Sequence, residues 1–185
     1  GATVYYTEFE DQIGRKVICD TRDGSDPICE VNGVTREYIN QYTNHDSAEL
    51  RGVELFFNVP LGPVDLKTNY TYSDSEITES KDSPESVGQP FNNLPKHMVN
   101  VGVDWAATEA LGVWAKARYK SSTVEDSTSQ RPSYTLVDVG ALYSVSDNFD
   151  VYGGLYNLFD KQVTAEDYGK TLDGRRLNLG VAFNF

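Results

Sequence analysis

Three cations alternate along one short segment in the second half of the chain. Lys116, Arg118 and Lys120 are separated by single residues, Ala117 and Tyr119. If this segment is a β-strand, its successive side chains point to opposite faces, so the three cations share one face. A row of positive charges on one face attracts an anionic ligand, and aromatic rings beside it add cation–π contacts.

Further ligand-binding candidates lie in polar segments or at the starts of strands. They are cations or tyrosines: Arg131, Tyr134, Tyr168 and Arg176. The alternative is structural, because cations in a polar interior are satisfied by carboxylates such as Glu54, Asp104 and Asp138. For any single cation, the sequence favours this structural pairing over contact with a ligand.

The sequence lacks the residue sets on which enzymes and nucleic-acid-binding proteins depend. His45 and His97 are far apart, and no Ser/His/Asp or Cys/His set has informative spacing. The formal net charge is −12, and no basic stripe is present to neutralise phosphates. We therefore expect neither an enzyme nor a nucleic-acid-binding protein, and no resident cofactor or metal.

Two cysteines, Cys19 and Cys29, flank a segment rich in turn-forming residues. We expect them to form a disulfide that closes a surface loop, as is common in proteins that mature in oxidising compartments. By the chain-entropy argument, such a bridge contributes about 2 to 3 kcal/mol. A metal or redox pair is the weaker alternative, because CxxC spacing and nearby histidines are missing.

The candidate residues need strands to position them, and the end of the chain shows the clearest strand pattern. Residues 175–185 alternate between apolar and polar side chains and end on an aromatic residue, Phe185. Such a strand with one apolar and one polar face is typical of an antiparallel transmembrane β-barrel. The segments that we expect to be strands are Ala2 to Ile13, Tyr38 to Val59, Val64 to Tyr72, His97 to Ala107, Gly112 to Ser122, Ser133 to Ser144, Phe149 to Leu158 and Arg175 to Phe185.

Short turns alternate with long polar linkers between these strands. The turns are expected at 60–63, 108–111 and 145–148, and the linkers at 14–35, 73–95, 124–132 and 159–174. Outer-membrane barrels have short periplasmic turns and long extracellular loops. The mean hydropathy of −0.47 is no objection, because only every second residue of a barrel strand meets lipid.

The short turns fix the direction of each strand, and the aromatic residues then fall into two groups, one at each end of the strands. Trp105, Tyr143, Phe149 and Phe183 fall at turn ends together with Phe57 and Phe185, whereas Tyr70, Tyr72 and Tyr119 fall at loop ends. Two aromatic girdles are expected at the two surfaces of a membrane. A soluble β-sandwich is the alternative, but it gives no reason for this sorting.

The linker at 73–89 is acidic, with five carboxylates against one lysine, Lys81. A solvated surface loop is the simplest interpretation. Divalent ions that bridge it to lipopolysaccharide phosphates, or a weak calcium site, are alternatives without a specified geometry.

Three motifs occur together and in order along the chain. They are Ala48-Glu-Leu-Arg-Gly-Val-Glu54, then Leu94-Pro-Lys-His-Met-Val-Asn100, and then Tyr156-Asn-Leu-Phe-Asp-Lys161 followed by Gly174-Arg-Arg176 and the terminal Phe185. This combination resembles the C-terminal third of TonB-dependent outer-membrane receptors, especially the ferric-siderophore receptors of the catecholate type. The resemblance covers nearly the whole chain.

The resemblance implies a 22-stranded barrel with a plugged lumen. Residues 1–185 would supply its last eight or so strands, with Phe185 as the terminal aromatic residue used in barrel assembly. The plug domain and the TonB box have no counterpart here, and the chain begins within a strand pattern without an initiator Met or signal peptide. The implied function is uptake of a ferric siderophore, with energy relayed by TonB.

Two rival functions stay open. A self-contained eight-stranded outer-membrane barrel would be a structural or adhesion protein with side chains filling its lumen. The outer loops are also a candidate docking surface for bacteriocins or phages, a use compatible with uptake. The implied partners are therefore outer-membrane lipid and lipopolysaccharide, the remaining strands and plug of the same receptor, TonB, and possible bacteriocins or phages.

Overall fold

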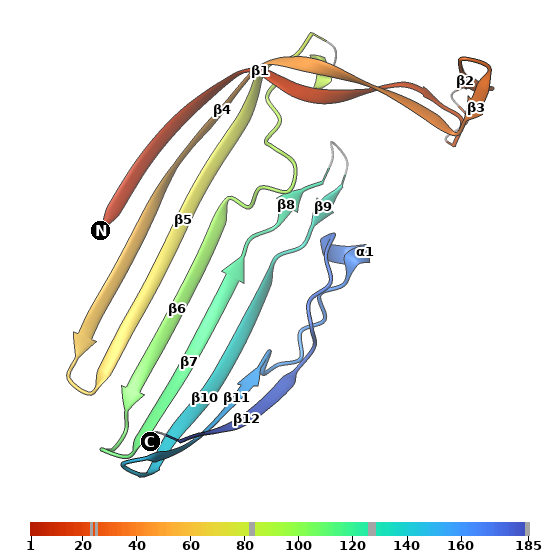
Figure 1. Ribbon diagram of the computed structural model, residues 1–185. Helices are drawn as coiled ribbons and strands as arrows, with labels where there is room; N and C mark the ends of the chain where they lie inside the picture. The colour runs from red at the N-terminus through yellow and green to blue at the C-terminus, as the bar shows by residue number, and fades with distance from the viewer. Residues whose placement is uncertain (23, 25, 82–83, 126–128, 184–185) are drawn as a thin grey trace. The chain divides into compact units, whose positions relative to one another are not determined.

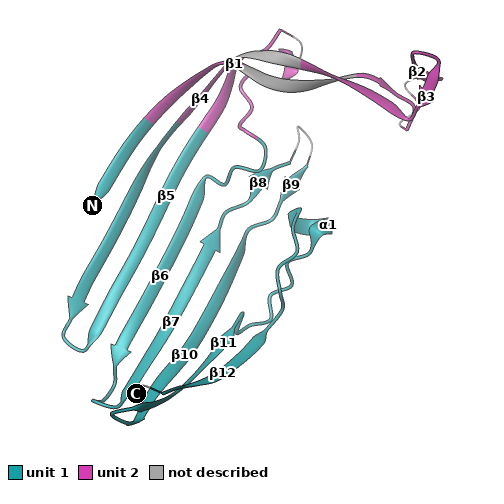
Figure 2. Cartoon of the chain, in the orientation of Figure 1, with its two compact units in different colours: residues 1–5, 51–74, 92–185 teal, residues 6–50, 75–91 magenta. Residues whose placement is uncertain are grey.

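The computed structural model describes residues 1–22, 24, 26–81, 84–125 and 129–183, apart from the side chains of 12–17 and 43–46. Phe185 and the side chain of His45 therefore lie outside the described residues. Contacts divide the chain into two units, shown in Figure 2. The first comprises residues 1–5, 51–74 and 92–185, and the second comprises residues 6–50 and 75–91.

The described chain is almost entirely β-structure, and its main sheet has eight strands in sequence order. As Figure 1 shows, each strand pairs with the next main strand along the chain. The strands are β1 (Ala2–Asp20), β4 (Tyr38–Leu61), β5 (Val64–Glu79), β6 (His97–Ala106), β7 (Leu111–Lys120), β10 (Tyr134–Ser146), β11 (Phe149–Tyr156) and β12 (Arg176–Phe183). All eight predicted strands are confirmed, and those from β5 to β12 pair antiparallel.

The connections between these strands contain short secondary-structure elements. Two short hairpins are formed by β2 (Cys29–Val31) with β3 (Val34–Arg36), and by β8 (Thr123–Val124) with β9 (Gln130–Arg131). A 3-10 turn, η1, covers Pro84–Ser86, and a four-residue helix, α1, covers Ala165–Tyr168. Among the described residues, no helix is long and apolar enough to cross a bilayer.

The register confirms the predicted alternation in the first unit. Residues directly opposite each other in an antiparallel pair lie on the same face of the sheet. One row of such partners crosses six strands and is apolar throughout: Leu66, Val103, Ala115, Val139, Leu155 and Leu177. We call the face that carries this row the apolar face, and the opposite face the polar face.

Large apolar side chains on the apolar face are exposed. Leu179 is 77% and Leu177 66% accessible, and Trp105, Tyr143 and Phe183 are each close to half accessible. Exposed apolar area on this scale marks a surface that meets another apolar phase. The sheet is therefore built to be covered on this face by something outside the described chain.

Two ends of the first unit's sheet differ in their connections. At one end, short turns join β4 to β5, β6 to β7 and β10 to β11, and we call it the turn end. In the turn after β6, the hydroxyl of Thr108 accepts hydrogen bonds from the amides of Ala110 and Leu111, at 3.2 and 3.0 Å. The opposite end, where longer connections lie, is the loop end.

The predicted linkers at 14–35 and 73–95 begin too early in the sequence, because the strands before them are longer than expected. Strand β1 continues to Asp20 and β5 continues to Glu79, so residues 73–79 of the acidic segment are strand rather than loop. Ser73 and Ser75 are even buried, with 5% and 8% exposure. Backbone pairing does not require apolar side chains, so a strand can extend where both faces are polar and alternation gives no signal.

Candidate functional site

A pocket of about 280 Å³ lies at the loop end of the polar face. Lys120 and Tyr134 are direct cross-strand partners here, at the end of β7 and the start of β10. The pocket, which we call the loop-end pocket, is lined by Met98, Asn100, Arg118, Tyr119, Lys120, Tyr134, Leu136, Lys170 and Leu172. Three of these residues are cations, so the lining combines positive charge with an aromatic ring and an apolar floor.

Tyr134 is the centre of the aromatic contacts at this pocket. Its ring meets that of Tyr168 edge-to-face, with the centroids 5.5 Å apart. The Lys170 ammonium lies 5.3 Å from the centroid of the Tyr134 ring, within the range of a cation–π interaction. Tyr168 is buried, with 8% exposure, and therefore supports Tyr134 rather than facing the pocket itself.

The connection from 157 to 175 is ordered by its own contacts, although its sequence predicted only a polar linker. Thr164 caps α1 by accepting a hydrogen bond from the Asp167 amide, and Gly169 ends the helix with a φ of +69°. Val163 is buried, and its carbonyl accepts a hydrogen bond from the amide of Leu172 at 3.0 Å. This packing fixes the segment that carries Lys170.

Arg131 has a structural position beneath this connection. Its guanidinium donates to Glu125 at 2.5 Å, and only 17% of its side chain is exposed. A side chain at Gly169 would displace the end of this guanidinium, and the positive φ of +69° itself favours glycine there. Burial lowers the pKa of Lys120 below its ordinary value, and repulsion from the nearby charges of Lys170 and Arg131 lowers it further.

Arg118 is paired, as the structural alternative predicted. Its Nη2 donates to Oδ2 of Asp138 at 2.9 Å, and Asp138 is buried. More than half of the Arg118 side chain stays accessible, so its remaining donors still face the loop-end pocket. Arg118 therefore contributes positive potential to the pocket, although the carboxylate of Asp138 partly neutralises its charge.

Two predicted residues lie apart from the loop-end pocket. Arg176 pairs with Asp173 at 2.9 Å, lies 5.7 Å from the ring centroid of Tyr156, and borders a neighbouring hollow of about 150 Å³. Lys116 lies farther toward the turn end, 5.4 Å from the ring centroid of Trp114. The structure thus gathers Lys120, Tyr134, Tyr168 and Arg131 at or beside the loop-end pocket. Lys116 and Arg176 each border a different hollow, and Arg118 lines both of these hollows as well as the pocket.

Lys170 is the pocket cation that sequence reasoning missed. It lies in a connection without periodicity, so no strand pattern assigned it to a face. The available signal was its distance of two residues from Tyr168, which was itself a candidate.

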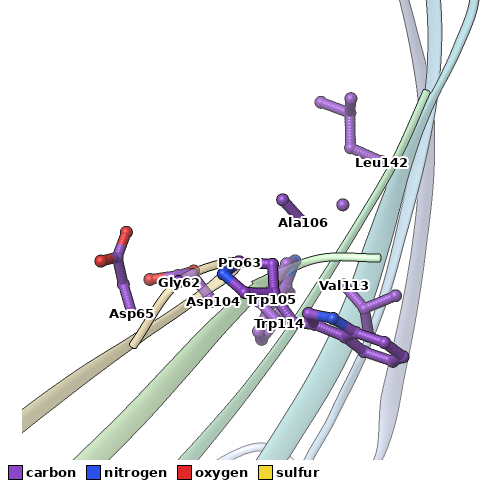
Figure 3. A pocket seen from close by; sticks show the side chains of 10 residues that line it. Gly62, Pro63, Asp65, Asp104, Trp105, Ala106, Val113, Trp114 and Leu142 are labelled. Carbon is purple, nitrogen blue, oxygen red and sulfur yellow. The ribbon is translucent and has the colours of Figure 1, made fainter. Parts of the chain in front are cut away.

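Another hollow, of about 340 Å³, lies at the turn end and is shown in Figure 3. Among the described residues that line it, the charged ones are two aspartates, Asp65 and Asp104, and none is a cation. Trp105 and Trp114 complete much of its wall, as the figure shows. The absence of a cation among its described lining residues makes it unsuited to an anionic ligand.

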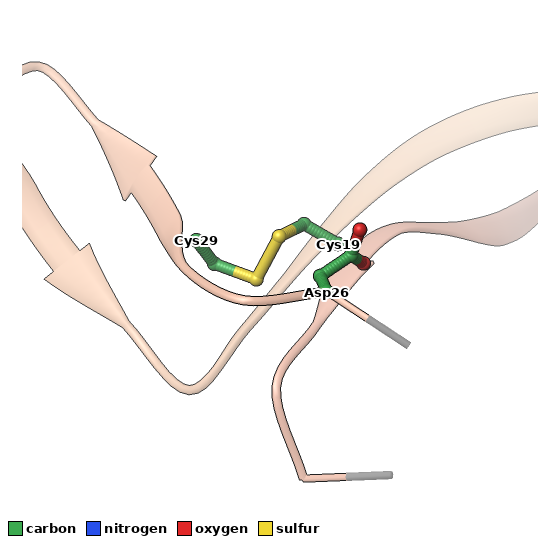
Figure 4. Close-up of side chains that lie close together, drawn as sticks. All are labelled: Cys19, Asp26 and Cys29. Atoms are coloured by element: carbon green, nitrogen blue, oxygen red, sulfur yellow. A yellow bond between two sulfur atoms is a disulfide. The ribbon is translucent and has the colours of Figure 1, made fainter. Parts of the chain in front are cut away.

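The predicted disulfide between Cys19 and Cys29 is present, within the second unit (Figure 4). Asp26 lies close to both sulfur atoms, so the three residues are near enough to resemble a metal-ligand cluster. Sulfurs that are bonded to each other are not thiolates and do not serve as metal ligands in the usual way. In the same loop, hydrogen bonds from Arg22 lower the pKa of Asp20 to about 2.

Comparison with known proteins gives a consistent result. Residues 1–158 match the family described as "TonB dependent receptor-like, beta-barrel". The chain is 32% identical to the iron-regulated outer membrane virulence protein of Vibrio cholerae over 99% of its own length and 28% of that protein. It is 28% identical to the vitamin B12 transporter BtuB of Photobacterium profundum, covering 87% of the chain and 24% of the transporter.

A solved structure agrees with these sequence matches. The siderophore receptor PiuA from Acinetobacter baumannii superposes with a TM-score of 0.69 at 28% identity, covering 77% of this chain and 23% of PiuA. The chain spans less than a third of the length of each of these proteins.

Proposed function

The chain belongs to the TonB-dependent receptor β-barrel family, and we propose that it forms part of the barrel of an outer-membrane receptor that takes up a ferric siderophore. The apolar face supports this proposal, because its exposed row of side chains suits contact with lipid. The polar face then lines the lumen, and the loop end faces the outside of the cell. The family match does not favour a self-contained eight-stranded structural barrel.

The observation that carries the ligand assignment is the set of cations in the loop-end pocket. Lys120, Lys170 and Arg118 line one hollow beside the ring of Tyr134. Ferric complexes of catecholates are anionic and present flat aromatic rings. Cations attract such a complex from solution, and an aromatic side chain orients it.

The residues in and around the pocket have different roles in recognition of the ligand. Lys120 and Lys170 supply the charges that approach the ligand, while Arg118 is held by Asp138 and adds to the potential. Tyr134 presents a ring whose position is supported by Tyr168. Arg131 pairs with Glu125 within its own hairpin, and its guanidinium lies against Gly169 of the connection.

The chain spans 28% of the Vibrio cholerae relative, and we propose that the remaining steps of uptake belong to other parts of the same receptor. We propose that a plug domain and further strands of the same receptor complete the barrel, and that TonB acts through that missing part. The transport itself requires no enzymatic reaction, and the relatives compared above are named as transporters, receptors or membrane proteins.

The test is ligand binding by the full-length receptor that contains this segment. The probes are a ferric tricatecholate complex and, as the rival suggested by one relative, vitamin B12. Replacing Lys120 and Lys170 with Gln should weaken tricatecholate binding by roughly tenfold per cation. Lys67→Gln, which removes a paired lysine outside the pocket lining, is the control and should bind normally.

Three outcomes would contradict this assignment. The double variant would bind the tricatecholate complex as tightly as the wild type, the Lys67 control would weaken binding equally, or the wild type would bind only vitamin B12. The first two would reject the loop-end pocket, and the third would reject the ferric siderophore as the ligand.

Docking of bacteriocins or phages on the outer loops is a second proposal, compatible with uptake. Deleting residues 80–90 and measuring killing separately from iron uptake distinguishes the two roles. Loss of killing with retained uptake would support a separate docking surface.

A further inference from the structure

A second cationic cluster lies at the loop end, on the other side of the sheet from the loop-end pocket. Asp74 is its centre: Lys96 Nζ donates to Oδ1 at 2.9 Å, and Arg51 Nη2 and Nε donate to Oδ2 at 2.8 and 3.1 Å. Asp74 has only 18% side-chain exposure, whereas Arg51 and Lys96 have 60% and 54%. The carboxylate is thus recessed, and the two cations form the accessible surface.

The direction of this cluster follows from its immediate neighbours in the strands. Ser73, next to Asp74, is hydrogen-bonded to the hydroxyl of Tyr5 at 2.7 Å. Gly52, next to Arg51, lies against the same tyrosine hydroxyl. Because successive side chains of a strand point to opposite faces, Asp74 and Arg51 point away from Tyr5, on the face that also carries Tyr72 and Leu66. The cluster therefore lies on the apolar face.

An aromatic group lies directly below the cluster, toward the turn end. The ring of His97 stacks on that of Tyr70, with the centroids 6.1 Å apart, and lies 5.4 Å from the ring centroid of Tyr72. His97 Nδ1 and the Tyr70 hydroxyl are also hydrogen-bonded at 2.9 Å. Rings that are apolar in body and polar at the tip mark the level at which a membrane protein leaves the hydrocarbon layer.

We propose that Arg51 and Lys96 bind the phosphate groups of lipid A, the membrane anchor of lipopolysaccharide. The cations lie just beyond the aromatic group on the lipid-facing side, which is the level of lipid headgroups. The set of Asp74, Arg51 and Lys96 carries a net charge of +1, and its two outermost groups are donors suited to phosphate oxygens. This inference depends on the apolar face meeting lipid and is independent of the transported ligand.

Asp74 contributes by holding the two cations before the lipid arrives. Both side chains are long and lose rotamer freedom on binding, and their shared contact with one carboxylate restricts them in advance. The acidic segment at 73–89 was expected to be a solvated surface loop, with divalent ions bridging it to lipopolysaccharide as one alternative. Its second residue has a different role here, because it positions basic residues that contact phosphate directly.

The experiment measures binding of diphosphoryl lipid A to the full-length receptor in neutral detergent micelles, with fully dephosphorylated lipid A as the comparison. Replacing Arg51 and Lys96 together with Gln should weaken binding of the diphosphoryl form by roughly 10- to 30-fold. Binding of the dephosphorylated form should be weaker in the wild type and unaffected by the substitutions.

A matched control is available in Lys67. Like Lys96, it donates to an aspartate, at 2.8 Å compared with 2.9 Å, and both lysine side chains are 54% exposed. Lys67 lies on the polar face, so Lys67→Gln should leave lipid A binding unchanged while Lys96→Gln weakens it. The exchange Arg51→Lys with Lys96→Arg keeps both charges and should retain most of the binding, which separates loss of charge from loss of folding.

Equal binding of diphosphoryl lipid A by the wild type and the Gln double variant would overturn the proposal. It would equally be overturned if Lys67→Gln weakened binding as much as Lys96→Gln, or if the wild type did not distinguish the phosphorylated from the dephosphorylated lipid. None of these results bears on binding of the siderophore, so the two proposals fail independently.

Discussion

The backbone amide of Asn157 donates a 2.8 Å hydrogen bond to Oδ1 of Asp138. The other oxygen of this carboxylate accepts a hydrogen bond from the guanidinium of Arg118. The side chain of Asn157 in turn accepts from the Lys161 amide and donates to the carbonyls of Lys161 and Asp173. One buried asparagine thus ties the strand that carries the pocket to both ends of the connection that carries Lys170.

Replacing Asn157 with Ala should release that connection. Three side-chain hydrogen bonds would be lost, and alanine would be forced into the left-handed backbone conformation, since the φ of Asn157 is 51°. We expect a loss of about 1 to 3 kcal/mol in local stability, seen as faster proteolysis within residues 159–174. Asn178→Ala, on an exposed strand position, is the control and should cleave at the wild-type rate.

The two faces of β6 should respond differently to the same charge. Val101 opposes Thr68 and Ala117 on the apolar face, whereas Asn100 opposes Asn69 and Arg118 on the polar face. Val101→Arg should lower the unfolding free energy in lipid vesicles by about 2 to 4 kcal/mol, with a much smaller loss for Asn100→Arg. Equal losses would mean that the apolar face does not meet lipid.

Acid should weaken the Asp74 cluster. Hydrogen bonds from Lys96 and Arg51 lower the pKa of the Asp74 carboxyl below its ordinary value of 3.8. A pKa that is lower in the folded state adds stability above the unfolded pKa, and this contribution is lost as the pH falls through the folded pKa. The difference in unfolding free energy between the wild type and Asp74→Asn should therefore be constant above about pH 5 and shrink below pH 3.8. A difference that is the same throughout this range would contradict the assigned ion pairs.

Removing the disulfide should affect only the second unit. The bridge closes a loop with a sequence separation of 10 residues, so replacing both cysteines with Ser should cost about 2 to 3 kcal/mol of local stability. Protease cleavage between residues 20 and 28 reports this loss. Binding at the loop-end pocket should not change, because that pocket lies wholly in the first unit. Weakened ligand binding would show that the two units are coupled.

Alternation predicted the fold well where one face is apolar and the other polar. The phase assigned to Val99, Val101 and Val103 agrees with their partners in β5 and β7, and the cations of β7 share the polar face as expected. In these strands the side-chain pattern and the backbone pairing follow the same physical constraint, because lipid on one side and water on the other select alternate residues.

Prediction failed where that constraint ends. Ser73 to Glu79 carry no apolar alternation, so the extension of β5 was missed. Asp74 was taken as part of an acidic loop, and its partners Arg51 and Lys96 come from segments 23 and 22 residues away, beyond the reach of local patterns. Lys170 was missed for the same reason, since only the contacts of α1 and its flanks bring it to Tyr134.

The apolar row from Leu66 to Leu177 also sets which lengths of insertion the gene tolerates. One residue inserted into any of these six strands would move every later side chain of that strand to the wrong face, while two residues would restore the phase. A single bulge, as between Ser144 and Ser146 near the turn after β10, is tolerated because it lies where the strand ends. Length differences among descendants of this gene should therefore be even-numbered within strands, whereas the phase of the strands sets no such rule for the loop-end connections.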